Sequence, residues 1–384
     1  PYLAVGAVVL AFSIFFLFNP PDQSPTFETI WFGTWIFCVF LFWTFVEVPY
    51  ESLGPEITFD YHERIALFGW RDGALIAGTL VAASSPALVS QFLSLSPTAS
   101  GERTKFFWIS ALYAPLVVAF CWWCVASIRE RTLHADPIRL GLGSGLRLVL
   151  RNRPFMVLLI SYTVAAFGSN LPATLILFYV EYVLHSKMAD FFLAFYFVTG
   201  IVFLPGWVFL AKRIGKKYAW ILSMVINTGA FVGVFFLGPG DALIYGILVF
   251  FSGIGFGATV AIPSAMQADV IDYDELLTGE RREGQYMGLW SITKKLAAAL
   301  GVGIALPLLG AVGYEPARAQ PEQVILMLRV LYALIPSLCN LLALLIVFAY
   351  PISSRIHREI RGAIADQKKG LRVEDPLNPG RVIS

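Results

Sequence analysis

Charged residues are scarce in this sequence. Asp, Glu, Lys and Arg make up 14% of its 384 residues, whereas a soluble domain contains about 25%. Apolar residues reach 57%, and 32 residues are Phe. Because so little of the chain is polar, a soluble globular domain is excluded and a polytopic membrane protein is predicted. The formal net charge of +2 gives no reason to expect a nucleic-acid partner.

The residues needed for several kinds of chemistry are also few or absent. The four cysteines lie in apolar stretches, which excludes a secreted disulfide scaffold. The four histidines are scattered, and no two have zinc-ligand spacing. The sequence contains no P-loop and no GxSxG motif. We therefore expect neither an enzyme nor a bound cofactor.

Ten apolar stretches are long enough to cross a bilayer as helices, which need about 20 residues each. None shows the alternation of a barrel strand, so an all-α membrane protein is predicted. The glycine-rich run at 253–257 has no strand–helix unit around it, and we interpret it as a helix-packing surface. The ten stretches are 3–18, 30–51, 71–92, 107–128, 154–182, 189–210, 218–237, 242–266, 286–311 and 323–349.

The chain repeats itself after six of these stretches. Asp60-Tyr61 follows the second stretch and Asp272-Tyr273 follows the eighth, and each comes after a Pro-containing segment. A six-helix period predicts a fold of two six-helix bundles, which is a transporter architecture. We expect two helices upstream of the first bundle, because only four of its helices are present. The predicted divisions are a first bundle at 1–128, a linker at 129–153, a second bundle at 154–350 and a tail at 351–384.

Most of the 28 Lys and Arg residues lie in alternate loops, including the linker and the tail. The positive-inside rule places these loops in the cytoplasm, so the predicted location is the cell (inner) membrane, with a cytoplasmic linker and C-terminus. Residues 354–365 predict either an amphipathic helix on the inner leaflet or an extension of the last span. The polar tail beyond Lys369 is expected to be disordered.

Ionisable groups inside membrane helices are costly and usually functional. Glu47 and Glu51 lie one helical turn apart in the second span, and Thr44 adds a hydroxyl on the same face. Such oxygens suit Na⁺ or a proton. The alternative is that both carboxylates lie at the helix end and contact water. Lys295 lies deep in the ninth span with Lys294 and needs an opposite charge, for which Glu47 is the candidate.

Charged residues also gather around the two Asp-Tyr motifs, in segments that we expect to be loops. Ion pairs formed there between the bundles would close the cytoplasmic side of a transporter, and the alternative is a pair of solvated loops. The predicted cytoplasmic gate consists of Asp60, Glu63, Arg64, Asp269, Asp272, Glu275, Arg281 and Arg282.

Two motifs resemble the signatures of the glycoside–pentoside–hexuronide:cation symporters, the melibiose-permease relatives in the major facilitator superfamily. The first is Thr44-x-x-Glu47-x-Pro49 with Leu53-x-Pro55-x-Ile57-Thr58-x-Asp60-x-x-x-Arg64. The second is Asp269-x-x-Asp272-Tyr273-x-Glu275-x-x-Thr278-Gly279-x-Arg281-x-Glu283-Gly284, followed by Lys294-Lys295. The resemblance covers nearly the whole chain.

The resemblance implies a major facilitator fold and alternating access, with a solute coupled to Na⁺, H⁺ or Li⁺. It also implies that Glu47 and Thr44 serve a cation site, that Lys295 lies near it, and that Arg71 binds solute. Glu47 stands in place of an Asp, and Glu51 stands where melibiose permeases have a sugar-stacking Trp. Both departures argue against melibiose itself as the solute.

The predicted function is therefore cation-coupled transport of a small polar solute, such as a sugar or glycoside, in contact with membrane lipid. Within the family the alternative is a lysolipid-like amphiphile, because aromatic residues such as Phe32, Phe37 and Trp43 suit sugars and acyl chains alike. A membrane enzyme or sensor is the alternative from another class. It would need a nucleophile–base pair or a soluble domain, and the sequence shows neither.

Overall fold

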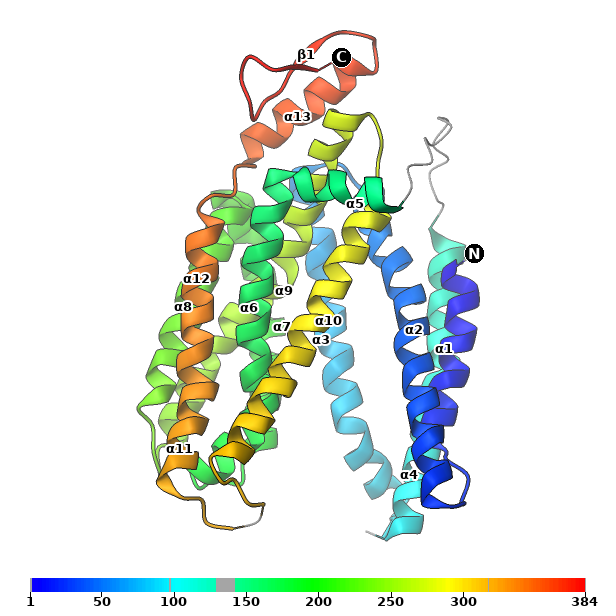
Figure 1. Ribbon diagram of the computed structural model, residues 1–384, viewed down its shortest axis with the longest axis vertical. Coiled ribbons are helices and arrows are strands. Elements are labelled where there is room, and N and C mark those ends of the chain that lie inside the picture. Colours follow the sequence, from blue (N-terminus) through cyan, green and yellow to red (C-terminus); the bar gives the residue numbers. More distant parts are fainter. Residues whose placement is uncertain (1, 97, 129–141, 317, 384) are drawn as a thin grey trace. The chain divides into compact units, whose positions relative to one another are not determined.

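The computed structural model describes residues 2–96, 98–128, 142–316 and 318–383, and these residues are mostly helical (Figure 1). The all-α prediction is confirmed. The α-helices are α1 (Tyr2–Phe18), α2 (Pro25–Ile57), α3 (Tyr61–Phe92), α4 (Ala99–Ser127), α5 (Leu142–Arg151), α6 (Arg153–Phe178), α7 (Ala189–Ile214), α8 (Lys216–Phe235), α9 (Ala242–Thr278), α10 (Glu283–Ala311), α11 (Glu322–Arg329), α12 (Ile335–Val347) and α13 (Ser354–Gln367). Two π-helical turns, η1 (Tyr179–Val183) and η2 (Val330–Leu334), and two short strands, β1 (Val373–Glu374) and β2 (Val382–Ile383), complete the described elements.

Nine helices of the described ranges are long and apolar enough to cross a membrane. Two of them, Arg153–Val183 and Glu322–Val347, run through a π-helical turn. The first predicted stretch is also an apolar helix, Tyr2–Phe18, but with 17 residues it is shorter than the others. Hydropathy therefore located the helices well, although several continue beyond the apolar stretch that revealed them.

The described residues fold as two compact units. Unit 1 comprises Pro1–Ile57 and Gly78–Asp136, and unit 2 comprises Thr58–Ala77 and Pro137–Ser384. The first part of α3 thus belongs to unit 2, whereas the predicted bundle at 1–128 takes in all of α3. The division into bundles at 1–128 and 154–350 stays a prediction about the two halves of the transporter. Of the predicted linker, residues 129–141 lie outside the described residues, and residues 142–151 form α5.

Small residues allow the helices of unit 2 to approach closely. A Cβ atom on Gly257 of α9 would lie 2.6 Å from the backbone oxygen of Gly200 on α7. On α3, a Cβ on Gly69 or Gly73 would lie 2.7 or 2.8 Å from a side chain of α7, Val208 or Leu204. The glycine-rich run is therefore a packing surface, as predicted, and glycines also fit the first part of α3 against α7.

The π-helical turns η1 and η2 meet in the core of unit 2. The rings of Tyr179 in η1 and Tyr332 in η2 stack with their centroids 4.3 Å apart. The hydroxyls of Tyr332 and Tyr245 lie 2.6 Å apart, and the Tyr179 hydroxyl donates to the carbonyl of Val234 at 2.7 Å. These bonds satisfy buried phenol groups in an otherwise apolar core. Nothing in the sequence analysis anticipated either π-helical turn.

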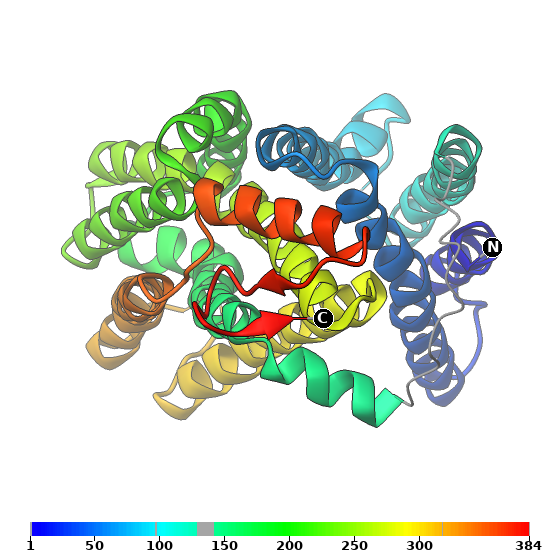
Figure 2. The same cartoon turned by 90° about the horizontal axis from the view of Figure 1, so that it is seen from above.

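The C-terminal segment differs from the predictions made for residues 354–365 and for the tail beyond Lys369. Helix α13 forms and is amphipathic, but its residues His357, Ile360 and Ile364 are buried by protein rather than lipid. Beyond Lys369 the prediction of disorder is wrong, since β1 and β2 pair antiparallel with Val373 opposite Ile383. Figure 2 shows α13 and the strands lying across the end of α9. The cause is polar contact with α9, described below.

The close approach of α7 and α9 predicts a matched pair of stability changes. Gly257→Val places a side chain against the backbone of Gly200, so we expect the free energy of unfolding to fall by about 1–3 kcal/mol. Gly206→Val, also on an apolar helix but with no atom within 4 Å of its Cβ position, is the control. Thermal unfolding in detergent measures both. Equal melting temperatures for the two variants would contradict this account of the glycine run.

Candidate functional site

Arg64 lies in the first part of α3 and is completely buried. Its Nη1 donates to Asp272 Oδ2 at 2.8 Å and to Asp269 Oδ1 at 3.1 Å, and its Nη2 donates to Asp272 Oδ1 at 3.0 Å. Both acids lie on α9. This forked arrangement is the geometry in which a guanidinium binds carboxylates most strongly. It ties α3 to α9 within unit 2.

Lys216 and His357 complete this group, which we call the Arg64 cluster: Arg64, Lys216, Asp269, Asp272 and His357. Lys216 Nζ, at the start of α8, donates to Asp269 Oδ2 at 2.6 Å. His357 Nε2, from α13, lies 2.9 Å from Asp272 Oδ2. Tyr61 also contributes, because its hydroxyl accepts from the Lys216 backbone N–H and the Lys216 ammonium lies 3.8 Å from its ring centroid. Two acids thus face two fixed cations, which offsets the cost of burying them.

Arg281 and Arg282 follow α9 and pair with its last turns. Arg281 Nη1 contacts Asp272 at 3.1 Å and Glu275 at 2.6 Å, and its Nε pairs with Glu283. Burial alone lowers the pKa of Arg281, but these three carboxylates raise it above its ordinary value. Arg282 pairs instead with Asp274 at 2.6 Å. Arg281 therefore extends the Arg64 cluster, whereas Arg282 makes a local contact between the end of α9 and the start of α10.

Asp60 and Glu63 have local roles at the start of α3. Asp60 Oδ1 accepts from the backbone N–H groups of His62 and Glu63, each at 2.8 Å, as a helix cap does. Burial raises the pKa of Asp60, but these two hydrogen bonds outweigh it and the pKa lies below its ordinary value. Glu63 accepts from the Thr58 hydroxyl. The prediction that the Asp-Tyr motifs form loops is wrong: Tyr61 begins α3, and Asp269–Glu275 are the last turns of α9.

The C-terminal segment reaches the same turns of α9. Tyr273 donates its hydroxyl to Asp375 at 3.1 Å, and Asn378 donates to the Asp375 carboxylate at 2.9 Å. Lys368 pairs with Glu275 at 2.8 Å. These bonds give a polar segment an ordered partner, and they explain why hydropathy alone mispredicted it.

A second polar group lies further along α3. Arg71 Nε donates to Asp72 Oδ1 at 2.7 Å, and Arg71 Nη2 donates to the Ser264 hydroxyl of α9 at 3.1 Å. The side chain of Arg71 is 17% exposed and that of Asp72 only 3%. Lys294 of α10 also attracts the Asp72 carboxylate. At 1.5 Å per residue, Arg71 lies about 15 Å into its helix, within the membrane-spanning part.

The predicted cation-site residues lie on α2 and α10. Glu47, which belongs to unit 1, is buried, and Thr44 donates its hydroxyl to the Phe40 carbonyl at 2.8 Å. Helix α2 continues without interruption through Pro49, Glu51 and Pro55. Lys295 lies inside α10, as expected, but in unit 2. The pairing of Glu47 with Lys295 stays a prediction.

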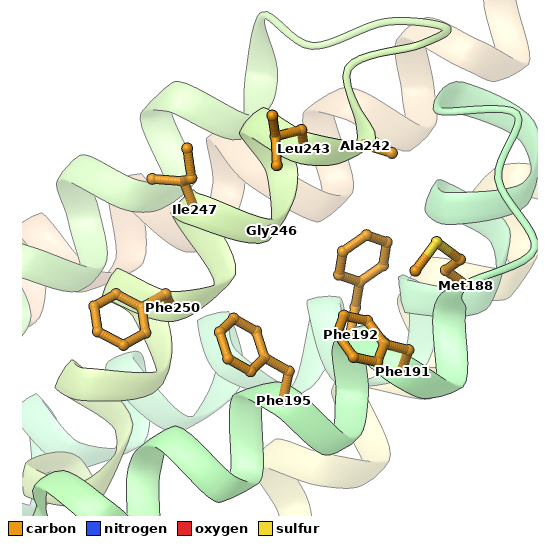
Figure 3. Close-up of a pocket in the computed structure, with 9 residues that line it drawn as sticks. All are labelled: Met188, Phe191, Phe192, Phe195, Ala242, Leu243, Gly246, Ile247 and Phe250. Carbon is orange, nitrogen blue, oxygen red and sulfur yellow. The ribbon is translucent and has the colours of Figure 1, made fainter.

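An apolar hollow of about 520 Å³ lies between α7 and α9 (Figure 3). It has no charged or hydroxyl-bearing side chain with which to bind a polar solute. Its lining consists of Met188, Phe191, Phe192, Phe195, Ala242, Leu243, Gly246, Ile247 and Phe250. Arg71, Asp72 and Ser264 are not among the residues that line this hollow.

Buried charges held between long apolar helices are typical of membrane transporters. Comparison with known families identifies the transporter family. Residues 1–354 match the family described as MFS/sugar transport protein. The chain belongs to this major facilitator family. It is therefore a multi-pass membrane transporter and not an enzyme, as the sequence predicted.

Named relatives and a solved structure agree with this assignment. The chain is 28% identical to the glucuronide carrier protein homolog of Escherichia coli, over 96% of this chain and 80% of that protein. It is 28% identical to a putative sulfoquinovose importer of Salmonella typhimurium, over 88% and 71%. Its fold is similar to that of the E. coli fucose:proton symporter FucP, with a TM-score of 0.66, 11% identity and coverage of 91% and 84%.

Sequence reasoning missed four residues of these groups, namely Asp72, Lys216, Ser264 and His357. Asp72 is an acid within a predicted span, next to Arg71, and an ionisable residue at such a position is itself a candidate functional residue. Lys216 was visible only as part of a basic loop, and His357 only as a scattered histidine. Their partners come from other helices, so sequence spacing could not connect them.

The Arg64 cluster predicts a large stability effect. Arg64→Met leaves Asp269 and Asp272 with too little positive charge, so we expect the free energy of unfolding to fall by about 3–5 kcal/mol. The control is Arg318→Met, whose pair with Glu315 has side chains that are 74% and 61% exposed, where about 1 kcal/mol or less is expected. Thermal unfolding of both variants in detergent is the measurement. Adding Asp272→Asn to Arg64→Met should restore part of the loss, and a further decrease instead would refute the pairing.

Proposed function

We propose that this transporter carries an acidic sugar, such as a glucuronide, together with a cation by alternating access across the cell membrane, with the linker and the C-terminus in the cytoplasm. The observation that carries the proposal is the guanidinium of Arg71 inside a membrane-spanning helix. It is partly exposed, it is held in place by Asp72 and Ser264, and Lys294 lies near enough to act on the same group. A planar guanidinium binds a carboxylate or a sulfonate through two parallel hydrogen bonds.

The relatives support an acidic solute. One is named for a glucuronide, which carries a carboxylate, and one for sulfoquinovose, which carries a sulfonate. A hydroxyl-rich sugar ring with one anionic group fits a site that offers both Ser264 and Arg71. The amphiphile alternative would instead use an apolar surface such as the hollow between α7 and α9.

The proposed coupling site lies on α2. Thr44, Glu47 and Glu51 are three or four residues apart in sequence, so their oxygens share one helix face, and Lys295 on α10 is the proposed counter-charge. A carboxylate with hydroxyl oxygens suits Na⁺ or H⁺. The Arg64 cluster with Glu275 and Arg281 is the proposed cytoplasmic gate, and Asp60, Glu63 and Arg282 stabilise the helix ends beside it.

The proposal is tested by uptake into proteoliposomes that contain the full-length protein, with an imposed Na⁺ or H⁺ gradient. We expect accumulation of methyl β-D-glucuronide but little of methyl β-D-glucoside, its neutral counterpart. Arg71→Gln should raise the KM for the glucuronide about tenfold or more, because it removes a charge-assisted hydrogen bond. Arg103→Gln, which alters a surface pair with Asp22, is the control. Equal uptake of the two glycosides would refute an acidic solute, and uptake of a lysolipid instead would favour the amphiphile alternative.

Coupling predicts a different defect for Glu47. Glu47→Gln keeps the shape of the side chain but removes its charge, so we expect gradient-driven accumulation to be lost while exchange of labelled for unlabelled solute continues. Glu28→Gln is the control, because Glu28 lies on the same helix with its side chain 40% exposed. Accumulation by Glu47→Gln at the parent rate would show that this carboxylate is not the coupling group.

A further inference from the structure

Asp72 has a feature that binding to Arg71 alone does not explain. Its Oδ1 accepts from Arg71 at 2.7 Å, but its Oδ2 is buried and makes no hydrogen bond to any residue in the described ranges. The whole residue is 2% exposed. A buried carboxylate oxygen normally has a partner, so this atom is positioned to receive one that arrives during function.

The surroundings of Asp72 determine what that partner is. Arg71 on its own helix and Lys294 on α10 are the charged groups that act on the carboxylate, and Ser264 of α9 is the polar neighbour. On the remaining side, α7 packs apolar side chains against α3, with Leu204 next to Gly73. Two cations already attract Asp72, so a further metal cation there would be repelled. A proton is the cation small enough to add to Oδ2 under these conditions.

The solute's acid group changes the balance at Arg71. An anion that binds this guanidinium places a second negative charge beside Asp72 and shares Arg71 with it, and a nearby like charge favours protonation of a buried carboxylate. Protonation of Oδ2 relieves the repulsion. The carboxylic acid formed is neutral, and Arg71 is then left to the solute.

We propose that Asp72 is a second proton-binding group, which takes up one proton when an acidic solute binds Arg71, so that solute and proton occupy the transporter together. This inference rests on the proposed function, since it needs an anionic solute at Arg71. It adds to that function a residue on α3, separate from Glu47 on α2. The step forms one O–H bond at Asp72 Oδ2 with a proton from solvent, and no other covalent bond changes.

Calorimetric titration of the purified full-length protein with methyl β-D-glucuronide tests the inference. Repeating the titration in buffers of different ionisation enthalpy gives the number of protons taken up. We expect about one proton per bound solute, and the Kd should rise about tenfold per pH unit in the range where the proton is taken up, because proton uptake and binding are linked. In Asp72→Asn that proton and that pH dependence should be lost, and binding at high pH should be tighter than in the parent.

Asp190→Asn is the matched control, because it makes the same change at an exposed acid in the first turn of α7, and it should keep the parent's proton uptake. Thermal unfolding shows whether Asp72→Asn is folded. If it binds glucuronide with the parent's proton uptake and pH slope, the proposal for Asp72 is wrong while the acidic-sugar function stands. If the parent protein does not bind the glucuronide, the proposed solute fails, and the proposal for Asp72 fails with it.

Discussion

The buried guanidinium of Arg64 constrains the rest of unit 2. A charge removed from water must find opposite charge at close range, and Asp269 and Asp272 provide it on α9 at 3.1 and 2.8 Å. Arg71, two helical turns after Arg64, contacts Ser264, two turns before Asp272. The two pairs of contacts run in opposite directions along the chain, so α3 and α9 lie antiparallel. The ion pair thereby fixes which face of α3 carries Arg71 and Asp72 towards α9.

The C-terminal segment depends on the same ion pair. Asp272 accepts from Arg64 and also contacts His357 of α13, so one carboxylate joins three helices that are far apart in the sequence. Arg64 engages both oxygens of this carboxylate, and His357 Nε2 lies 2.9 Å from one of them, so α13 is held at the same point where α3 meets α9. Ile360 and Ile364 then pack on the same side of α13. An amphipathic pattern is typical of a membrane-surface helix, but in this chain the apolar face of α13 packs against protein.

The sequence predicted what depends on local composition and failed where distant residues meet. Apolar length located the helices, and the Asp-Tyr motifs identified Arg64, Asp269 and Asp272. Periodicity could not show that these motifs are helical, because the last turns of α9 bury charged residues such as Asp269 and Asp272 beside apolar ones such as Ile271. Asp72 was overlooked beside Arg71, since its importance comes from Ser264 and Lys294 on other helices. The π-helical turns follow from the packing of Tyr179 on Tyr332, which no single segment encodes.

A mechanical consequence follows from placing two charged groups on one helix. Arg64 and Arg71 are seven residues apart, about 10 Å along the axis of α3, and Gly69 and Gly73 bring the backbone between and beyond them close to α7. Since an α-helix is stiff over two turns, a tilt of α3 that separates Arg64 from α9 also changes the distance from Arg71 to Ser264. Helix α3 therefore transmits a change at Arg71, the proposed solute-binding residue, directly to the Arg64 cluster. This is a physical basis on which occupancy of one site can bias the other.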